Sequence, residues 1–221
     1  MARIFSDQER LFNPQKFHWD LHIIGAGGIG NSLIQLFAKM GVSKIHVWDD
    51  DIFEARNGPT EVAYSEALVG QPKIDVAAAT VDFLVGDHCK LIRHQERVTP
   101  DTPLSGIVIS GVDSMASRKQ IWKAVLNCFF DVALYIDARS AGEEIAIVNV
   151  DPMDDENAHI YEEDWLFDDS EATPLECGAR NIGYISFLIA AIVAANVAKF
   201  EQGNDLKFNQ FINTSNINQM F

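Results

Sequence analysis

Short apolar runs and longer amphipathic segments alternate along the first two thirds of the chain. A short, mainly apolar run predicts a strand, and apolar side chains spaced three or four residues apart predict a helix. Their alternation is typical of a parallel sheet with helices on both faces, a doubly wound α/β fold. The expected strands are Leu21–Ile24, Lys44–Trp48, His88–Arg93, Gly106–Ser110, Val132–Asp137 and Glu144–Val150, and the expected helices are Ile29–Met40, Lys73–Val85 and Ala116–Cys128.

The last two of these strands follow one another directly, which predicts an antiparallel C-terminal extension of the sheet. Gly183–Ala198 carries no charged residue and predicts a helix buried on most faces, because it is shorter than the roughly 20 residues of a membrane span. A strand-like stretch, Leu206–Ile212, follows it. At the other end, Ser6 and Glu9 form a capping-box pattern that predicts a short helix. No linker is visible, so we expect one domain over residues 1–221.

The chain is acidic, with 32 Asp and Glu against 17 Lys and Arg and a formal net charge of −15. Such a charge repels nucleic acids and anionic membranes, so neither is an expected partner. Ten carboxylates fall between Asp151 and Glu171. Residues 151–176 are therefore expected to form a mobile, solvated crossover loop or, alternatively, a surface that steers a basic partner. Three cysteines without a C-x-x-C pair, and an N-terminus without a long apolar core, suit a reducing cytoplasm.

Four neighbouring glycines, Gly25, Gly27, Gly28 and Gly30, lie where the first strand turns into the first helix. Glycine lets the backbone approach phosphates closely, and the N-terminus of a helix offers free N–H groups and positive potential. Asp49 lies about 20 residues further on, where a carboxylate accepts hydrogen bonds from ribose hydroxyls. This Rossmann-like arrangement fits NAD and ATP equally, so the glycines leave the nucleotide open.

Three further motifs, in a fixed order and at compatible spacing, distinguish an ATP site from an NAD site. Over roughly residues 8–200 they resemble the ThiF/MoeB/HesA family, relatives of ubiquitin-activating enzymes, and in particular a short bacterial and phage subgroup of it. The matching positions are Asp49 and Asp51 (D-x-D), Asn57, Val69–Lys73 (V-G-x-P-K), Asp113 and Arg118 (D-x-x-x-x-R), and Cys177, which precedes the long apolar helix.

The resemblance implies that the glycine loop holds ATP, with Mg²⁺ as the accompanying ion. Joining a carboxylate to a phosphate brings two anions together, so catalysis is mainly positioning and charge neutralisation. Lys73 would place a positive charge on the phosphates, and Asp113 would hold Mg²⁺. Asn57 and Arg118 would orient the phosphates or brace the site. The local sequence also permits a helix start for Lys73, a helix cap for Asp113 and a solvated turn acid for Asp51.

Two arginines of the family pattern are missing from this chain. The motif N-x-x-R-Q has Thr60 and Glu61 in place of its Arg and Gln. The N-terminal motif Y-N-R-Q, whose Arg reaches into the partner subunit's site, has Pro14 in place of that Arg. A charge-assisted hydrogen bond contributes about 1.5–3 kcal/mol, so these losses weigh against efficient adenylation. The candidate replacements in the sequence are Arg10, Arg56 and Arg139.

Cys177 lies where thioester-forming members of the family carry their nucleophile. A thioester requires a partly exposed thiolate near a cation or a helix N-terminus, and Arg180 with the following helix supplies both. Many relatives carry a Cys at this position without using it. A structural role for Cys177 therefore stays open.

The resemblance implies a cytoplasmic, homodimeric adenylyltransferase that activates the C-terminal carboxylate of a small ubiquitin-like or sulfur-carrier protein as an acyl-adenylate. A non-catalytic nucleotide-binding subunit is the first alternative, favoured by Thr60 and Pro14. An NAD-dependent oxidoreductase is the second, favoured by the glycines and Asp49 alone. The candidate catalytic residues are Lys73, Asp113 and Cys177, and the candidate cofactor-binding residues are Gly25, Gly27, Gly28, Gly30, Asp49, Asp51, Asn57, Lys73 and Arg118.

Overall fold

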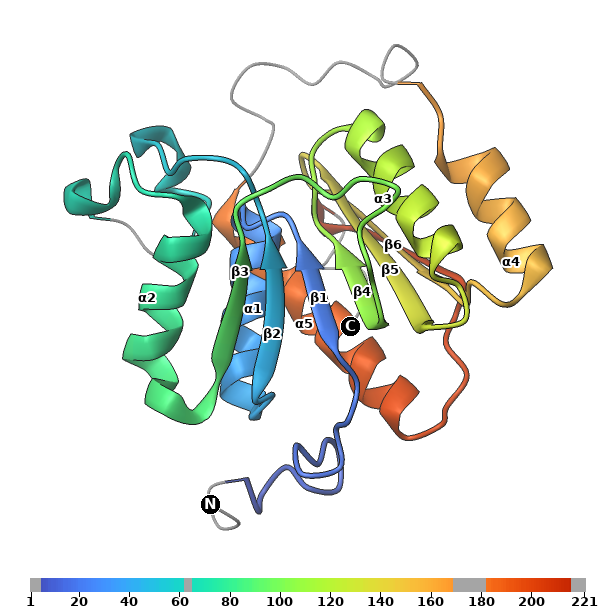
Figure 1. Ribbon diagram of the computed structural model, residues 1–221, viewed down its shortest axis with the longest axis horizontal. Helices are drawn as coiled ribbons and strands as arrows, with labels where there is room; N and C mark the ends of the chain where they lie inside the picture. Colours follow the sequence, from blue (N-terminus) through green and yellow to red (C-terminus); the bar gives the residue numbers. More distant parts are fainter. Residues whose placement is uncertain (1–4, 62–64, 169–181, 216–221) are drawn as a thin grey trace.

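A seven-stranded sheet forms the centre of the molecule (Figure 1). The computed structural model describes residues 5–61, 65–168 and 182–215. The strand order is β3-β2-β1-β4-β5-β6-β7, with β1 to β5 paired in parallel and β6 and β7 antiparallel. The strands are β1 (Leu21–Ile24), β2 (Lys44–Trp48), β3 (Lys90–His94), β4 (Gly106–Ser110), β5 (Val132–Ala141), β6 (Glu144–Val150) and β7 (Asn209–Asn213).

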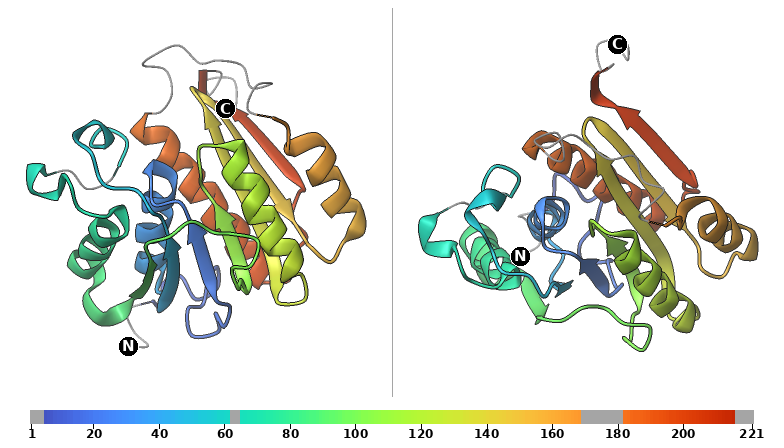
Figure 2. Two further views of the ribbon diagram at one scale, coloured as in Figure 1. Left: turned by 45° about the horizontal axis from the view of Figure 1, so that its top comes forward. Right: turned by 90° about the horizontal axis from the view of Figure 1, so that it is seen from above.

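Helices cover both faces of this sheet (Figure 2). One apolar cluster joins the first face to α1, α2 and α5, and a second joins the opposite face to α3, α4 and η4. This arrangement confirms the predicted doubly wound α/β fold with an antiparallel C-terminal extension. The helices are α1 (Gly28–Met40), α2 (Lys73–Val85), α3 (Met115–Asn127), α4 (Asp155–Ile160) and α5 (Gly183–Glu201), with short turns of 3₁₀-helix at η1 (Ala55–Asn57), η2 (Glu66–Leu68) and η3 (Gly86–His88) and of π-helix at η4 (Tyr161–Trp165).

The winding of the chain reverses between β1 and β4. From β1 the chain runs outward through β2 and β3, and it then returns to place β4 and β5 on the other side of β1. The helices that follow β1 and β4 consequently lie on opposite faces of the sheet, and ligands of open α/β sheets bind at such a switch point. We call the ends of β1, β2 and β4, together with the loops that follow them, the carboxyl edge.

Gly41 ends α1, and the N-terminal segment packs against it. It has φ +96°, and the backbone N–H groups of Gly41 and Val42 donate to the last carbonyls of the helix, which is the usual glycine C-cap. A Cβ atom at Gly41 would lie 2.8 Å from Phe5 and 2.9 Å from Pro14, so the N-terminal segment packs directly against this position. Thirteen helical residues span about 20 Å, which separates Pro14 from the glycine loop at the other end of α1.

The N-terminal helix predicted from the Ser6 capping box is wrong. Residues 5–11 form consecutive turns instead. Tertiary contacts decide the conformation here, since Nε2 of Gln8 donates to the carbonyl of Met40 over 2.6 Å and Phe12 is 4% exposed.

The prediction of a mobile loop for residues 151–176 is also wrong for part of that segment. Residues 155–165 form α4 and η4, and the Asp154 carboxylate caps α4 by accepting from the N–H groups of Glu156 and Asn157. Tyr161 is fully buried and Trp165 is 9% exposed, so two aromatic side chains anchor the segment to the sheet. The high density of acids conceals this apolar pair in the sequence. Residues 169–176 lie outside the described part of the chain.

α5 is less buried than the sequence predicts. Ile185, Ile189 and Val193 are fully buried in the cluster that joins α5 to α1 and the sheet. Tyr184 and Phe187, on another side of the helix, are 47% and 55% exposed. By length and composition alone α5 could also cross a membrane, a criterion that core helices of soluble proteins also meet.

Candidate nucleotide-binding site

The glycine loop joins β1 to α1 at the carboxyl edge. Gly25 has φ +94°, and a Cβ atom there would lie 3.0 Å from the carbonyl oxygen of Gly111 in the loop after β4. A Cβ atom at Gly30 would lie 1.7 Å from the carbonyl oxygen of Gly25, which no side chain could accommodate. Around Gly27 a Cβ atom would meet nothing within 4 Å. These glycines therefore close the β1–α1 turn against the β4 loop and leave open space at Gly27.

The N-terminus of α1 is free to receive an anion. Its N-cap residue, Gly27, makes no side-chain cap hydrogen bond, and the first turn of α1 carries no acidic residue. The first N–H groups of any helix lack partners within that helix and present positive potential. This is the geometry that binds phosphate in nucleotide-binding loops.

Asp49 ties the glycine loop to the end of β2. Its Oδ2 accepts a hydrogen bond from the backbone N–H of Ala26 over 2.6 Å, and its Oδ1 accepts from the N–H of Asp51 over 2.7 Å. Burial raises the pKa of Asp49, although these two N–H groups oppose the rise. The structure thus gives Asp49 a role in shaping the loop, and its predicted contact with ribose stays a prediction.

Lys73 begins α2 and points its ammonium group at the carboxyl edge. Its Nζ lies 3.0 Å from Oδ2 of Asp51, and the Lys73 side chain is 11% exposed against 58% for that of Asp51. Burial opposes the charged form, but the hydrogen bond that Lys73 donates to Asp51 and the charge of Asp49 raise the pKa of Lys73 overall. A fixed positive charge therefore lies beside the acids that follow β2. Asp51 is a partner of this lysine rather than an isolated turn acid.

The side chains of Asn57 and Thr60 make hydrogen bonds within their own loop. The Asn57 side-chain oxygen accepts from the N–H of Glu54 over 2.7 Å, and the Thr60 hydroxyl donates to the Asn57 carbonyl over 3.0 Å. A Cβ atom at Gly183 would lie 3.1 Å from the Pro59 carbonyl oxygen, so the start of α5 supports this loop. The contact of Asn57 with phosphates stays a prediction.

Asp113 follows β4 and is exposed at the carboxyl edge. Its carboxylate makes no hydrogen bond or ion pair with any residue that the structure describes. The alternative that Asp113 caps α3 is wrong, because Ser114 is the N-cap and its Oγ accepts from the N–H of Ser117. A free carboxylate fits Mg²⁺, which proteins usually hold through one or two carboxylates together with substrate phosphates.

Arg97 is a cation at this edge that sequence reasoning missed. It lies three residues after β3, and its Nε is 2.9 Å from Oδ2 of Asp50. The hydrogen bond with Asp50, and more weakly the charge of Asp113, raise the pKa of Arg97. Its side chain is 73% exposed and can change partners. Its position just past a strand end was the only signal in the sequence, because no motif includes it.

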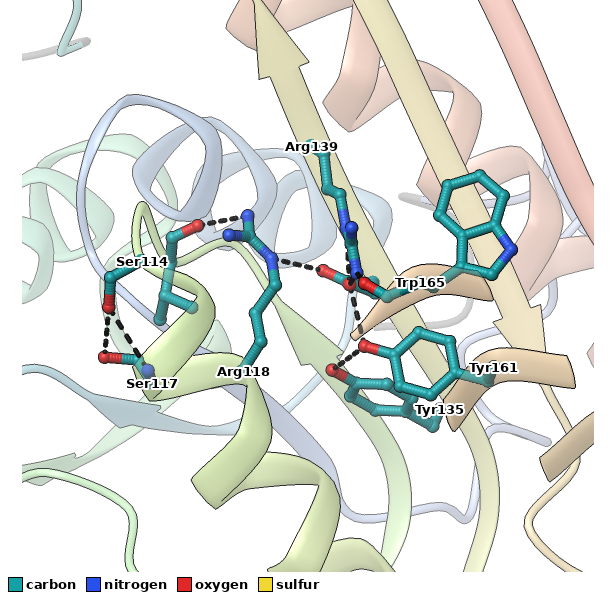
Figure 3. Close-up of polar contacts among 9 residues, drawn as sticks. Ser114, Ser117, Arg118, Tyr135, Arg139, Tyr161 and Trp165 are labelled. Atoms are coloured by element: carbon teal, nitrogen blue, oxygen red, sulfur yellow. Dashed lines mark hydrogen bonds and ion pairs between the residues drawn. The ribbon is translucent and has the colours of Figure 1, made fainter. Parts of the chain in front are cut away.

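Arg118 lies in a buried network behind the Asp113 loop (Figure 3). Its Nε is 3.1 Å from Oδ1 of the fully buried Asp137, and its Nη2 donates to the carbonyl of Val112. Arg139 and Tyr161 also bind Asp137, over 2.7 Å from the Arg139 Nε and 2.8 Å from the Tyr161 hydroxyl. In the described structure Arg118 therefore braces the loop before Asp113. Its contact with phosphates stays a prediction.

Asp137 is ionised despite its burial. Burial alone would raise its pKa, but the charges of Arg118 and Arg139 hold the pKa below its ordinary value. Two guanidinium groups thus share one carboxylate. Arg139 also donates to the Trp165 carbonyl over 2.8 Å, and its guanidinium lies 5.3 Å from the Trp165 ring centre, which links the acidic segment to the site.

The three candidate replacements for the missing arginines lie in different surroundings. Arg10 belongs to the N-terminal segment at the far end of α1, Arg56 is exposed and paired with Glu54, and Arg139 is paired with Asp137. None of the three contacts the glycine loop through a hydrogen bond in the described structure. Arg97, in contrast, pairs with Asp50 in the loop after β2 and so lies at the carboxyl edge. Cys177 and Arg180 lie outside the described residues.

A model of the ThiF family matches residues 7–221. The chain belongs to the ThiF family. It is 35% identical over 82 residues to bovine (Bos taurus) adenylyltransferase and sulfurtransferase MOCS3, a match that covers 37% of this chain and 18% of MOCS3. It is 42% identical over 65 residues to the SAMP-activating enzyme E1 of Haloferax volcanii, covering 29% of this chain and 24% of that enzyme. The matches thus span about a fifth of the length of these curated relatives.

Solved structures share the fold of this ThiF-family chain. E. coli MccB with ATP superimposes with a TM-score of 0.70 at 19% identity, covering 91% of this chain and 63% of MccB. MccB with AMPCPP and MccA gives a TM-score of 0.74 at 18% identity, covering 97% of this chain and 69% of MccB.

Proposed function

We propose that this ThiF-family chain is an ATP-dependent adenylyltransferase. It would activate the C-terminal carboxylate of a small ubiquitin-like or sulfur-carrier protein as an acyl-adenylate. The names of its relatives MOCS3 and the SAMP-activating enzyme support the reaction class, and the structure of MccB with ATP supports the nucleotide. The observation that carries the proposal is the placement of Lys73 beside a glycine loop with an open helix N-terminus at the switch point.

The residues at the carboxyl edge suit this chemistry. A carboxylate oxygen of the carrier attacks the α-phosphorus of ATP, the bond from that phosphorus to the bridging oxygen breaks, and pyrophosphate leaves. Lys73 and the N–H groups of α1 would stabilise negative charge on the phosphates. Asp113 would hold Mg²⁺, which when bound supplies positive charge to the leaving pyrophosphate. No general base is required, because the nucleophile is already a carboxylate.

Exchange of pyrophosphate into ATP tests the complete proposal. With a carrier protein ending in Gly-Gly supplied, labelled pyrophosphate should appear in ATP, because formation of the acyl-adenylate is reversible. Calorimetry should also show tighter binding of Mg-ATP than of NADH. Tighter binding of NADH would contradict the ATP site and support the oxidoreductase alternative.

A non-catalytic nucleotide-binding subunit is the second candidate, and the residues Thr60 and Pro14 favour it. Pro14 packs at the far end of α1, and the described residues bring no arginine into contact with the glycine loop. Clear binding of Mg-ATP without exchange, for every carrier encoded near the gene, would support this candidate. We expect exchange instead. The ion pair of Lys73 at the carboxyl edge supports this expectation, as does an Asp113 carboxylate without a partner among the described residues.

We also propose that the protein is a cytoplasmic homodimer that binds neither nucleic acid nor membrane. The net charge of −15 supports the exclusion of anionic partners. Sedimentation of the purified protein would test the dimer, with a monomer at micromolar concentration as the contradicting result.

A further inference from the structure

Glu61 is a buried acid at the carboxyl edge for which the proposed chemistry has no use. It follows η1 in the chain and is 8% exposed. Lys73 from α2 and Asn31 from α1 lie close to its carboxyl group, and the carboxylates of Asp49 and Asp51 act on it from the end of β2. Among the described residues, one cation and three acids therefore gather beside the glycine loop.

Two polar atoms of this group have no hydrogen-bond partner among the described residues, Oε2 of Glu61 and Nδ2 of Asn31. Asn31 is fully buried one position after Gly30, and its Oδ1 already accepts a hydrogen bond from Gln35 over 2.7 Å. Buried polar atoms in native proteins nearly always have partners. This donor and this acceptor lie on neighbouring side chains and can pair with each other, so a phosphate that binds here would replace Glu61 as the partner of Nδ2 of Asn31.

The available atoms restrict the chemistry of that ligand. The proposed nucleotide site places phosphates beside Lys73 and the first turn of α1, close to both side chains. Phosphate oxygens accept hydrogen bonds, so Nδ2 of Asn31 can donate to one of them. An ionised Glu61 offers acceptors alone and would repel the phosphate, whereas a protonated carboxyl group offers an O–H donor.

The surroundings of Glu61 make the protonated form accessible near neutral pH. Burial raises the pKa of Glu61 to about 7, and the charges of Asp49 and Asp51 add to the rise. Lys73 and the amide of Asn31 oppose it. An anion that arrives beside this group would raise the pKa further, because it disfavours a second negative charge.

We propose that phosphates bind at this edge with Glu61 as a carboxylic acid, which takes one proton from the solvent and donates its O–H to a phosphate oxygen beside Nδ2 of Asn31. The inference rests on the proposed nucleotide site and deepens it by assigning the protonation state in which the site accepts an anion. Above about pH 7 each nucleotide bound then consumes up to one proton, and the affinity falls up to tenfold per pH unit.

Calorimetry of Mg-ATP binding at pH 8, in two buffers of different ionisation enthalpy, counts the protons taken up. We expect a value approaching one per site for the wild type and a value near zero for Glu61→Gln, which keeps the shape but cannot ionise. The dissociation constant of the wild type should rise about five- to sixfold from pH 7 to pH 8 relative to that of Glu61→Gln, because the protonated fraction of a group with a pKa of about 7 falls from about one half to about one eleventh. Protonation of the nucleotide itself is the same for both proteins and cancels.

Glu66→Gln is the matched control, because Glu66 is an exposed acid on η2 in the same connection. This variant should take up protons as the wild type does. Failure of the wild type to take up a proton while binding Mg-ATP would overturn the inference even without a folded variant. Equal uptake by the wild type and Glu61→Gln would also overturn it and leave the nucleotide site standing. No binding of Mg-ATP by either protein would reject the nucleotide site itself.

Discussion

At the residue scale, two cations lie among several acids at the carboxyl edge. Lys73 is held by Asp51, and Arg97 is held by Asp50, so each positive charge has a carboxylate partner before any phosphate arrives. An incoming phosphate must compete with these partners for the two cations. Lys73 is largely buried and fixed, whereas Arg97 is exposed and can turn toward a ligand. Lys73 should therefore dominate the recognition of phosphates.

Lys73→Ala should weaken the binding of ATP more than that of AMP, since AMP lacks the outer phosphates that a point charge at the start of α2 would reach. Loss of one charge-assisted hydrogen bond corresponds to about 1.5–3 kcal/mol, or roughly 10- to 100-fold in the dissociation constant for ATP. Calorimetry with both nucleotides measures the difference. Lys90→Ala, an exposed lysine at the opposite end of the sheet, should change neither value. Equal weakening of ATP and AMP would contradict a role at the outer phosphates.

Asp113→Ala should abolish the dependence of ATP binding on Mg²⁺, because the removed carboxylate is the proposed Mg²⁺ ligand and has no partner among the described residues. The neighbouring variant Ser114→Ala is the matched comparison: loss of the helix cap should lower the free energy of unfolding by about 0.5–2 kcal/mol. It should leave the Mg²⁺ dependence intact. Binding measured at several Mg²⁺ concentrations, together with denaturant unfolding, separates the two effects. Unchanged Mg²⁺ dependence in Asp113→Ala would remove Asp113 from the metal site.

Local motifs predicted part of the candidate site, and tertiary contacts determined the rest. The glycines, Asp49 and Lys73 are brought together because each adjoins a strand or helix end that the sequence marks clearly. Arg97 comes from a connection whose path over the edge depends on packing, so no spacing in the sequence revealed it. Glu61 occupies a motif position, but its burial beside Lys73 and Asn31 depends on packing too. The role of Arg118 as a brace could not be predicted, because it depends on Asp137, a residue of β5 that no motif contains.

At the element scale, the strands were predicted well because burial on both faces of the sheet makes most of their residues apolar. β1, β2, β4 and β6 have the predicted bounds, as has α2. β5 is longer than predicted, since Arg139 and Ser140 continue the strand while paired with β6. α4 and η4 were missed because their acids face solvent, and the two aromatic anchors, Tyr161 and Trp165, give too few apolar positions for a helical pattern.

Asp137→Asn should strongly destabilise the protein, because it leaves two buried guanidinium groups without their carboxylate. Removal of one partner from a buried ion pair costs about 3–5 kcal/mol. The pKa of Asp137 is lowered in the folded protein, so its contribution is fully present above the unfolded carboxyl pKa of about 4 and is lost as pH falls below it. Denaturant unfolding between pH 3 and pH 7 should show a smaller loss of stability on acidification in the variant. Parallel pH profiles would contradict this role.

At the scale of the whole molecule, a chain with net charge −15 would have to bind the proposed anionic nucleotide through local groups. The negative charge of the rest of the protein repels ATP. The glycine loop, the start of α1 and Lys73 therefore have to supply the attraction within a few ångströms. The doubly wound fold makes this possible, since the switch point brings the ends of β1, β2 and β4 to one edge.

The order of steps in the proposed reaction gives the last prediction. Its nucleophile would be the carrier's carboxylate, so Cys177→Ser should leave ATP–pyrophosphate exchange largely unchanged and abolish only a later thioester. Exchange assays, together with detection of a thiol-sensitive carrier adduct on non-reducing gels, separate the two steps. Cys128→Ser is the matched control, because Cys128 contacts the backbone near Thr102 at the end of α3, away from the carboxyl edge. Loss of exchange in a folded Cys177→Ser protein would show that the cysteine acts before or during adenylation, which would overturn this order of steps.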